Sequence, residues 1–177
     1  IRIIFCSSIQ AFTCYVPQAS GKPVTLPYLP VDGHIPARPS NLYGLSKAAG
    51  EQMLELYARE HEIEACSLRF PIVYMNDLPR SAWTLEKVLW RHSLDECFTF
   101  IPDTKVAELI EKLVARESWK GHRIFFPASR KPCIEKDFEE LYQQFYQDVP
   151  LKNPDRPLKS FADPSELEGF ADWKADD

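Results

Sequence analysis

Tyr43 and Lys47 are the two residues of this 177-residue sequence whose types and spacing best suit catalysis. They lie four positions apart in Tyr43-Gly-Leu-Ser-Lys47, so a helix would place the phenol and the ammonium on one face, one turn apart. A free tyrosine has a pKa of about 10 and is a poor base at neutral pH. A nearby lysine cation favours the phenolate, which can take a proton from an alcohol as hydride departs, or return it in reverse.

The spacing alone is a weak signal, because a surface lysine beside a tyrosine at the start of a helix would give the same pattern. None of the other six tyrosines has a lysine four residues on. Ser8 strengthens the interpretation, because it follows a short apolar run at the sequence start, and ligands bind at the carboxyl ends of parallel strands. Its hydroxyl could hydrogen-bond a reacting oxygen, although a turn residue at a strand end is the simpler explanation.

The elements that would position these residues follow from hydrophobic spacing and turn residues. Ile1–Cys6 is expected to be a buried strand, and the Pro- and Gly-rich stretch Val16–Asn41 an extended loop. An amphipathic helix is predicted over Leu45–His61 and a strand over Ala65–Val73, which contains Pro71. This order predicts a βαβ crossover and a parallel sheet.

The second half is predicted to hold shorter elements. Asp103 is expected to cap a helix over 104–117 with Val106, Ile110, Leu113 and Val114 on one face. An aromatic stripe from Ile134 to Tyr146 indicates core packing. The remaining expected elements are a helix over 83–94, a strand over 123–126 and a short helix over 165–170.

As a set, these segments resemble the extended short-chain dehydrogenase/reductase family, which includes NAD-dependent epimerases, dehydratases and sugar dehydrogenases. The resemblance covers about residues 1–74. It is carried by Ile3-Ile-Phe-Cys-Ser-Ser8, Pro39-Ser-Asn-Leu-Tyr-Gly-Leu-Ser-Lys47, Gly50-Glu51 and Leu68-Arg-Phe-Pro71.

The resemblance implies an α/β fold, a partial Rossmann-like parallel sheet with flanking helices and a small C-terminal α/β region on the substrate side. It implies that Tyr43 is the acid/base, that Lys47 assists it and contacts the nicotinamide ribose, and that Ser8 orients the substrate oxygen. Tyr43 and Lys47 would both also contact the cofactor. The segment along the nicotinamide would be Phe70, Pro71, Ile72 and Val73. The implied cofactor is NAD or NADP, and the implied substrate is a sugar or nucleotide sugar.

The family's glycine-rich phosphate loop does not occur in this sequence. The six glycines never form GxGxxG or GxxGxxG, so weak dinucleotide binding is expected. The sequence opens on Ile1 without a Met, and we expect a C-terminal portion of a larger protein. Residues 1–80 would then be half of a Rossmann-like catalytic domain, and residues 81–177 a substrate-side region and tail. The alternative function is a non-catalytic interaction or regulatory module, with homodimerisation or pairing through an exposed sheet edge.

Composition excludes several other classes. The net charge of −5 argues against a nucleic-acid surface. Five scattered cysteines favour reduced thiols, and no apolar run is long enough to span a membrane, so a cytoplasmic location is expected. The four histidines lack metal-ligand spacing, and no metal site is expected. Glu51, Glu55 and Arg59 would form i, i+4 pairs on a solvated helix face.

Overall fold

The computed structural model describes residues 1–13, 24–75 and 82–176. The first part of the chain forms β1 (Arg2–Ser8), the 3-10 turn η1 (Ile9–Ala11), α1 (Leu42–His61) and β2 (Glu64–Phe70). The predicted order of strand, loop, helix and strand is therefore confirmed over residues 1–13 and 24–70. The part of the expected loop that falls on residues 16–23 lies outside the described residues.

The main sheet is parallel and has the strand order β1-β2-β5, where β5 spans His122–Phe125. Ser7 pairs in register with Arg69, and Ser8 pairs with Phe70. Because the strands run in one direction, their carboxyl ends meet at one edge of the sheet. The predicted parallel α/β fold is confirmed, and this edge is where a ligand site is expected.

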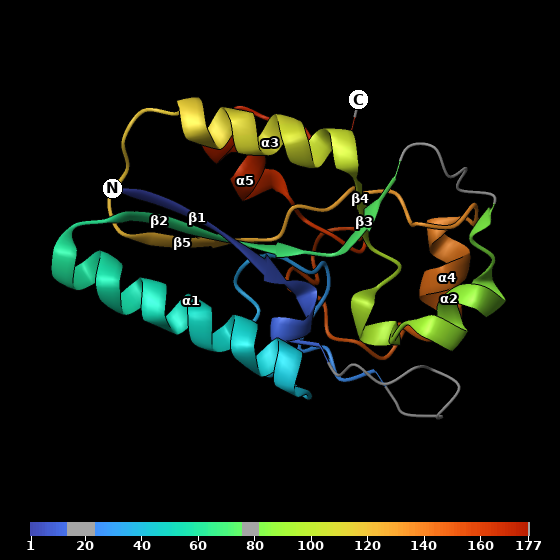
Figure 1. The fold of residues 1–177 in the computed structure, drawn as a ribbon. Coiled ribbons are helices and arrows are strands. Elements are labelled where there is room, and N and C mark those ends of the chain that lie inside the picture. The colour runs from blue at the N-terminus through green and yellow to red at the C-terminus, as the bar shows by residue number, and fades with distance from the viewer. Residues whose placement is uncertain (14–23, 76–81, 177) are drawn as a thin grey trace.

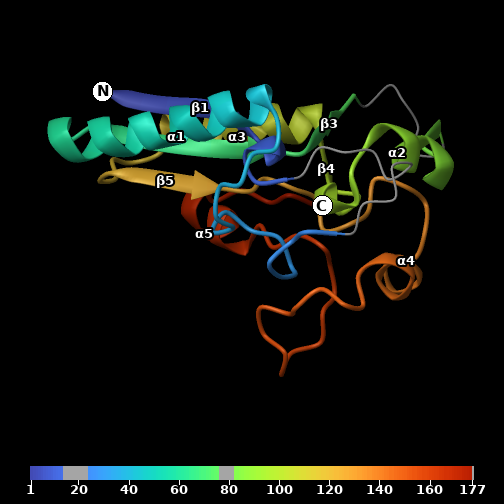
Figure 2. The same cartoon turned by 90° about the horizontal axis from the view of Figure 1, so that it is seen from below.

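Helices cover both faces of the sheet. α1 lies on one face, whereas α3 (Asp103–Ala115) and α5 (Ser165–Ala171) lie on the other (Figures 1 and 2). α1 approaches β1 so closely that a Cβ on Gly50 would lie 2.6 Å from the ring of Phe5. In Figure 1 the carboxyl end of β1 and the amino end of α1 lie at the same end of the molecule. That arrangement brings the Ser8 and Tyr43 regions together.

A second, two-stranded parallel sheet extends the architecture beyond this edge. The strand predicted over 65–73 is interrupted at Pro71, which cannot donate a ladder hydrogen bond. The chain continues as β3 (Ile72–Tyr74), which pairs with β4 (Phe100–Pro102). The short helices α2 (Leu85–Arg91) and α4 (Phe138–Phe145) lie near this pair in Figure 1.

Three local expectations were wrong. β1 was expected to be a buried strand, but its first residues are half-buried and Cys6 is exposed, since β1 pairs only with β2 among the described residues. Asp103 is the first residue of α3 rather than its cap, which is Pro102. On α3 the buried positions are Leu109 and Leu113, whereas Val114 is exposed.

Two clusters of buried side chains fill the interior. One combines residues of β2, α3, β5 and α5 around Leu68, Leu109 and Trp173. The other gathers the loop residues Leu29 and Val31 with aromatic residues of the second half, as the aromatic stripe predicted. The division of the chain at residue 80 stays a prediction. Among the described helices, none is long and apolar enough to cross a membrane.

The carboxylate of Glu168 fixes the C-terminal segment. It accepts two hydrogen bonds from Arg130, at 2.7 and 2.8 Å, and one from the Ala175 amide. The Arg130 guanidinium is the main cause that lowers the pKa of Glu168 to about 2. Since the folded-state pKa lies below that of the unfolded chain, this contribution is complete above pH of about 4.5 and is lost as pH falls toward 2.

Glu168→Gln is expected to lower the free energy of unfolding near neutral pH by up to about 3 kcal/mol. The difference from the wild type should shrink as pH falls from about 4.5 toward 2. Urea denaturation across this range measures it. Glu117→Gln, which removes an exposed carboxylate, is the control. A difference that stays constant with pH would contradict this assignment.

Candidate active site

The first turn of α1 positions Tyr43. The side chain of Asn41 caps the helix by accepting a hydrogen bond from the Gly44 amide at 2.7 Å. This cap fixes where the helix begins and hence the direction of the next side chains. Tyr43 is 52% exposed, so a ligand can reach this residue.

Lys47 lies one turn further along α1 and points toward β1. Its Nζ donates a hydrogen bond to the Cys6 carbonyl at 2.8 Å and lies 5.4 Å from the centre of the Tyr43 ring. A carbonyl is neutral, so this contact orients the ammonium without cancelling its charge. The predicted pair therefore shares a helix face, and a cation lies beside the phenol ring.

Ser8 ends β1 and is nearly buried. Its Oγ accepts a hydrogen bond from the Gln10 amide at 3.2 Å and caps η1. The simpler explanation of Ser8 as a turn residue thus describes part of its role. The hydroxyl hydrogen has no acceptor among the residues that the structure describes, which leaves it available to a substrate oxygen.

η1 and the start of α1 are in direct contact, and this contact holds Ser8 near Tyr43. The Asn41 side chain donates to Gln10 Oε1 at 3.2 Å. A Cβ on Gly44 would lie 2.2 Å from the Gln10 carbonyl oxygen, well inside van der Waals contact. Only glycine allows this approach, so Gly44 is required for α1 to pack against η1.

Gly44→Ala is therefore expected to lower the free energy of unfolding by about 1–3 kcal/mol, because backbone atoms must move apart. The control is Gly169→Ala in α5, where an added Cβ meets nothing within 4 Å. That change should stabilise the chain by about 0.5–1 kcal/mol through helix propensity. Urea denaturation measures both. Equal effects of the two substitutions would contradict the close contact.

The segment predicted to lie along the nicotinamide straddles the break at Pro71. Phe70 and Pro71 are buried, whereas Ile72 is half-buried and Val73 is 45% exposed. The pairing of Ser8 with Phe70 brings this segment to the sheet edge where β1 ends. Sheet pairing and hydrogen bonding thus gather Ser8, Lys47 and Phe70 around the end of β1.

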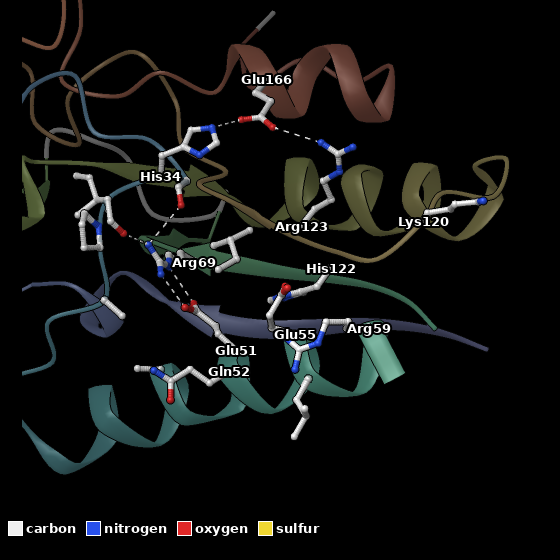
Figure 3. Close-up of a pocket in the computed structure, with 17 residues that line it drawn as sticks. His34, Glu51, Gln52, Glu55, Arg59, Arg69, Lys120, His122, Arg123 and Glu166 are labelled. Carbon is white, nitrogen blue, oxygen red and sulfur yellow. Dashed lines mark hydrogen bonds and ion pairs between the residues drawn. The ribbon is translucent and has the colours of Figure 1, made fainter. Parts of the chain in front are cut away.

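A buried ion pair that the sequence analysis missed lies behind this edge. Glu51 and Arg69 are each 3% exposed and form two hydrogen bonds, at 2.9 and 2.7 Å (Figure 3). Glu51 also accepts from Ser7 Oγ at 2.6 Å, and Arg69 donates to the Ile35 carbonyl at 2.5 Å. The interpretation of Glu51 as part of a solvated face was wrong. The available signal was Arg69, a charge inside an apolar strand that needs a buried partner.

An open pocket of about 850 Å³ lies beyond this pair, between α1, β5 and the loop at Gly33–Ala37 (Figure 3). α1 lines it with residues such as Gln52, Glu55 and Arg59. Residues of an α-helix turn by roughly 100° each, so these side chains lie roughly 120–180° around α1 from Tyr43. The pocket therefore faces away from the predicted acid/base pair.

His122 closes the inner wall of this pocket. Its ring nitrogens lie 2.7 Å from Ser67 Oγ and 3.2 Å from Glu55 Oε2. Burial lowers the pKa of His122 below its usual value, against the opposing effect of Glu55. The imidazole is thus held neutral near physiological pH and acts as a hydrogen-bonding group of the wall.

Comparison with known proteins agrees with this geometry. Residues 1–82, which contain β1, α1, β2 and β3, match the NAD dependent epimerase/dehydratase family. The first 82 residues of the chain are therefore similar to members of that family. The resemblance stated from the Ser-Ser and Tyr-x-x-x-Lys segments is therefore confirmed.

A curated relative and several solved structures extend the similarity along the chain. A uronate dehydrogenase of Pseudomonas syringae pv. tomato is 27% identical over 159 residues, which are 88% of this chain and 52% of that enzyme. Among solved structures, the UDP-N-acetylglucosamine 4-epimerase of Bacillus cereus matches 97% of this chain and 56% of its own, with a TM-score of 0.54 and 18% identity.

MoeE5, solved in complex with UDP-glucuronic acid and NAD, matches 98% of this chain and 59% of its own, with a TM-score of 0.55 and 13% identity. At these identities the solved structures show the fold alone. The chain spans about half the length of the relatives named here. The matched residues 1–82 include α1, the helix that bears Tyr43 and Lys47.

Proposed function

We propose that this chain carries the acid/base part of an NAD(P)-dependent enzyme that oxidises or epimerises a sugar or nucleotide sugar at a hydroxyl-bearing carbon. The observation that carries the proposal is the cation of Lys47, held by the Cys6 carbonyl at 2.8 Å and 5.4 Å from the Tyr43 ring. The match of residues 1–82 to the NAD dependent epimerase/dehydratase family supports the same class of reaction.

The chemistry of these residues is proton transfer at one oxygen. As the phenolate, Tyr43 takes the proton of the substrate hydroxyl while the carbon–hydrogen bond breaks, and it returns the proton in the reverse direction. Ser8 donates a hydrogen bond to the same oxygen, and Lys47 favours the phenolate through its charge. NAD(P), when bound, accepts or supplies the hydride.

The residues at the nicotinamide end fit this cofactor. Tyr43 is half-exposed, Val73 is exposed, and both lie in the segments that would meet the nicotinamide and its ribose. Lys47 would hold a ribose hydroxyl. The 177 residues contain no glycine-rich loop to receive a pyrophosphate, so we propose that this chain binds dinucleotides weakly and that its activity is impaired.

Calorimetric titration with NAD, NADP and nicotinamide mononucleotide tests the cofactor part of the proposal. Nicotinamide mononucleotide, which carries the nicotinamide and its ribose without the adenosine half, should bind about as well as NAD. Much tighter binding of NAD would contradict the proposal, because it would require a pyrophosphate site within the chain. For the substrate, free uronates and UDP-sugars should be compared at millimolar cofactor.

The uncovered edge of β1 favours a second role, association with another copy of the chain. β1 pairs only with β2 among the described residues. α1 also presents Leu42, which is 85% exposed, and Met53. An uncovered strand edge next to apolar side chains readily pairs with another chain.

Light scattering after size exclusion should therefore give about twice the monomer mass of 20.4 kDa. Ile1→Lys places a charge beside the edge and should shift the equilibrium toward monomer. A monomer at every concentration would reject this second role and leave the acid/base proposal unaffected. Association of the chain, together with a Tyr43→Phe substitution that changes no activity, would instead favour a non-catalytic interaction module.

A further inference from the structure

We infer that Arg69 is a positioning residue that holds Glu51 away from Lys47 and so preserves the lysine charge beside Tyr43. This inference rests on the proposed acid/base role of Tyr43. It concerns a part of the molecule that does not touch the reacting atoms, namely the buried pair behind the sheet edge (Figure 3).

Glu51 lies on α1 one turn after Lys47, where it could form an ion pair with the lysine. Tyr43, Lys47 and Glu51 follow one another at intervals of four residues. A glutamate one turn from a lysine is an ordinary ion-pair partner on a helix. Such a pair would offset the cation on which the Tyr43 phenolate depends.

In the structure the Glu51 carboxylate is fully engaged elsewhere. Its Oε1 accepts hydrogen bonds from Ser7 Oγ at 2.6 Å and Arg69 Nε at 2.9 Å. Its Oε2 accepts a hydrogen bond from Arg69 Nη2 at 2.7 Å. This fork-to-fork geometry satisfies the carboxylate and matches its charge. Lys47 is left with the neutral Cys6 carbonyl as its hydrogen-bond acceptor.

Arg69 is itself held in place from the opposite side. It donates to the Ile35 carbonyl at 2.5 Å and to the Gly33 carbonyl at 3.4 Å, and it lies 5.4 Å from the centre of the Phe12 ring. These contacts come from the loop before α1 and from the turn after β1. The guanidinium therefore cannot release Glu51 without breaking contacts to two other segments.

Other charged and titratable groups lie around the network on several elements. They belong to β1, the loop before α1, α1 itself and β5, and they remain unchanged in the variants below: Cys6, Tyr28, Asp32, Glu55 and His122. Of the charges on α1, Glu51 is one turn from Lys47, whereas Glu55 is two turns away and is hydrogen-bonded to His122. When Arg69 is removed, the negative charge of Glu51 is therefore the main one that offsets the positive charge of Lys47.

Selective labelling of tyrosine at ¹³Cζ tests the inference in the 177-residue chain without cofactor or substrate. The signal that is missing in Tyr43→Phe identifies Tyr43, and its chemical shift follows deprotonation of the phenol as pH rises. Three variants are compared with the wild type: Arg69→Gln, Glu51→Gln and the double variant. Arg59→Gln, which removes an exposed cation of α1, is the control.

In Arg69→Gln the carboxylate is freed, so the Tyr43 titration should move to higher pH by about half a unit. In Glu51→Gln the guanidinium is left unopposed, so the titration should move to lower pH by a similar amount. The double variant should return to the wild-type curve, and Arg59→Gln should stay close to it. Shifts of equal sign in the two single variants would overturn the inference, because damage to packing acts in one direction.

If Arg69→Gln does not fold, Glu51→Gln and the double variant still decide the question. A double variant that keeps the Glu51→Gln shift would overturn the inference. Since the titration needs no turnover, its result is separate from the proposed function. Full activity of Tyr43→Phe would reject the proposed function. A Tyr43 titration curve that is the same in all three variants as in the wild type would reject only the role of Arg69.

Discussion

Tyr43→Phe is expected to lower the rate of sugar oxidation or epimerisation by about 100- to 10,000-fold, the usual contribution of a positioned acid or base. The substitution removes one oxygen from a half-exposed ring, so stability and cofactor binding should change little. The rate should be measured at saturating sugar and millimolar NAD, as cofactor reduction for an oxidation and as formation of the epimer for an epimerisation. The loss should appear in kcat rather than in KM, because the proton transfer belongs to the transition state.

Tyr57→Phe is the matched control. Tyr57 lies on the same helix, is 49% exposed compared with 52% for Tyr43, and has no lysine four residues on. It should retain full activity. Equal rates for Tyr43→Phe and the wild type would remove Tyr43 from the mechanism, and equal losses in both variants would point to damage of α1 rather than loss of a proton carrier.

Arg69→Met is expected to cost about 3–5 kcal/mol of folding free energy, because it leaves the Glu51 carboxylate buried without a cation. The double variant Glu51→Leu/Arg69→Met should recover most of this loss, because an apolar pair of similar volume fills the same space and leaves no buried charge. Urea denaturation at neutral pH compares the two. The result separates the stability effect of the pair from its electrostatic effect on Lys47.

The exposed pair of Arg59 and Glu60 provides the contrast on the same helix. Arg59→Met should cost less than about 1 kcal/mol, because an exposed ion pair contributes little. An Arg69→Met loss as small as the Arg59→Met loss would mean that water reaches Glu51. A double variant no more stable than Arg69→Met would show that the guanidinium contacts to Ile35 and Gly33 dominate.

The sequence was sufficient for features that depend on local periodicity. The 3.6-residue repeat predicted a helix over Leu45–His61, which the structure shows as α1 with its start at Leu42. The order of strand, helix and strand predicted the parallel pairing of β1 with β2. The four-residue spacing of Tyr43 and Lys47 predicted that they share one helix face. In the structure Lys47 Nζ lies 5.4 Å from the centre of the Tyr43 ring and is hydrogen-bonded to β1. Position along the chain determines these relations.

The missed features depend on contacts between distant segments. Glu51 looks solvated when only its neighbours on the helix are considered, and its partner Arg69 is 18 residues away on β2. The half-exposed state of β1 reflects which strands pair with it, which apolar composition does not encode. Similarly, the close approach of Gly44 to Gln10 requires η1, a short turn with no periodic signal.

The location of the site can be measured directly by titrating the ¹⁵N-labelled chain with nicotinamide mononucleotide. We predict that saturable chemical-shift changes concentrate on Ser8, Tyr43, Lys47 and the segment Ile72–Val73, at the carboxyl edge of the sheet. The pocket lined by Glu55 and Arg59 on another face of α1 should respond weakly. Changes concentrated in that pocket, or no saturable change at millimolar ligand, would contradict the assignment of the acid/base site to Tyr43 and Lys47.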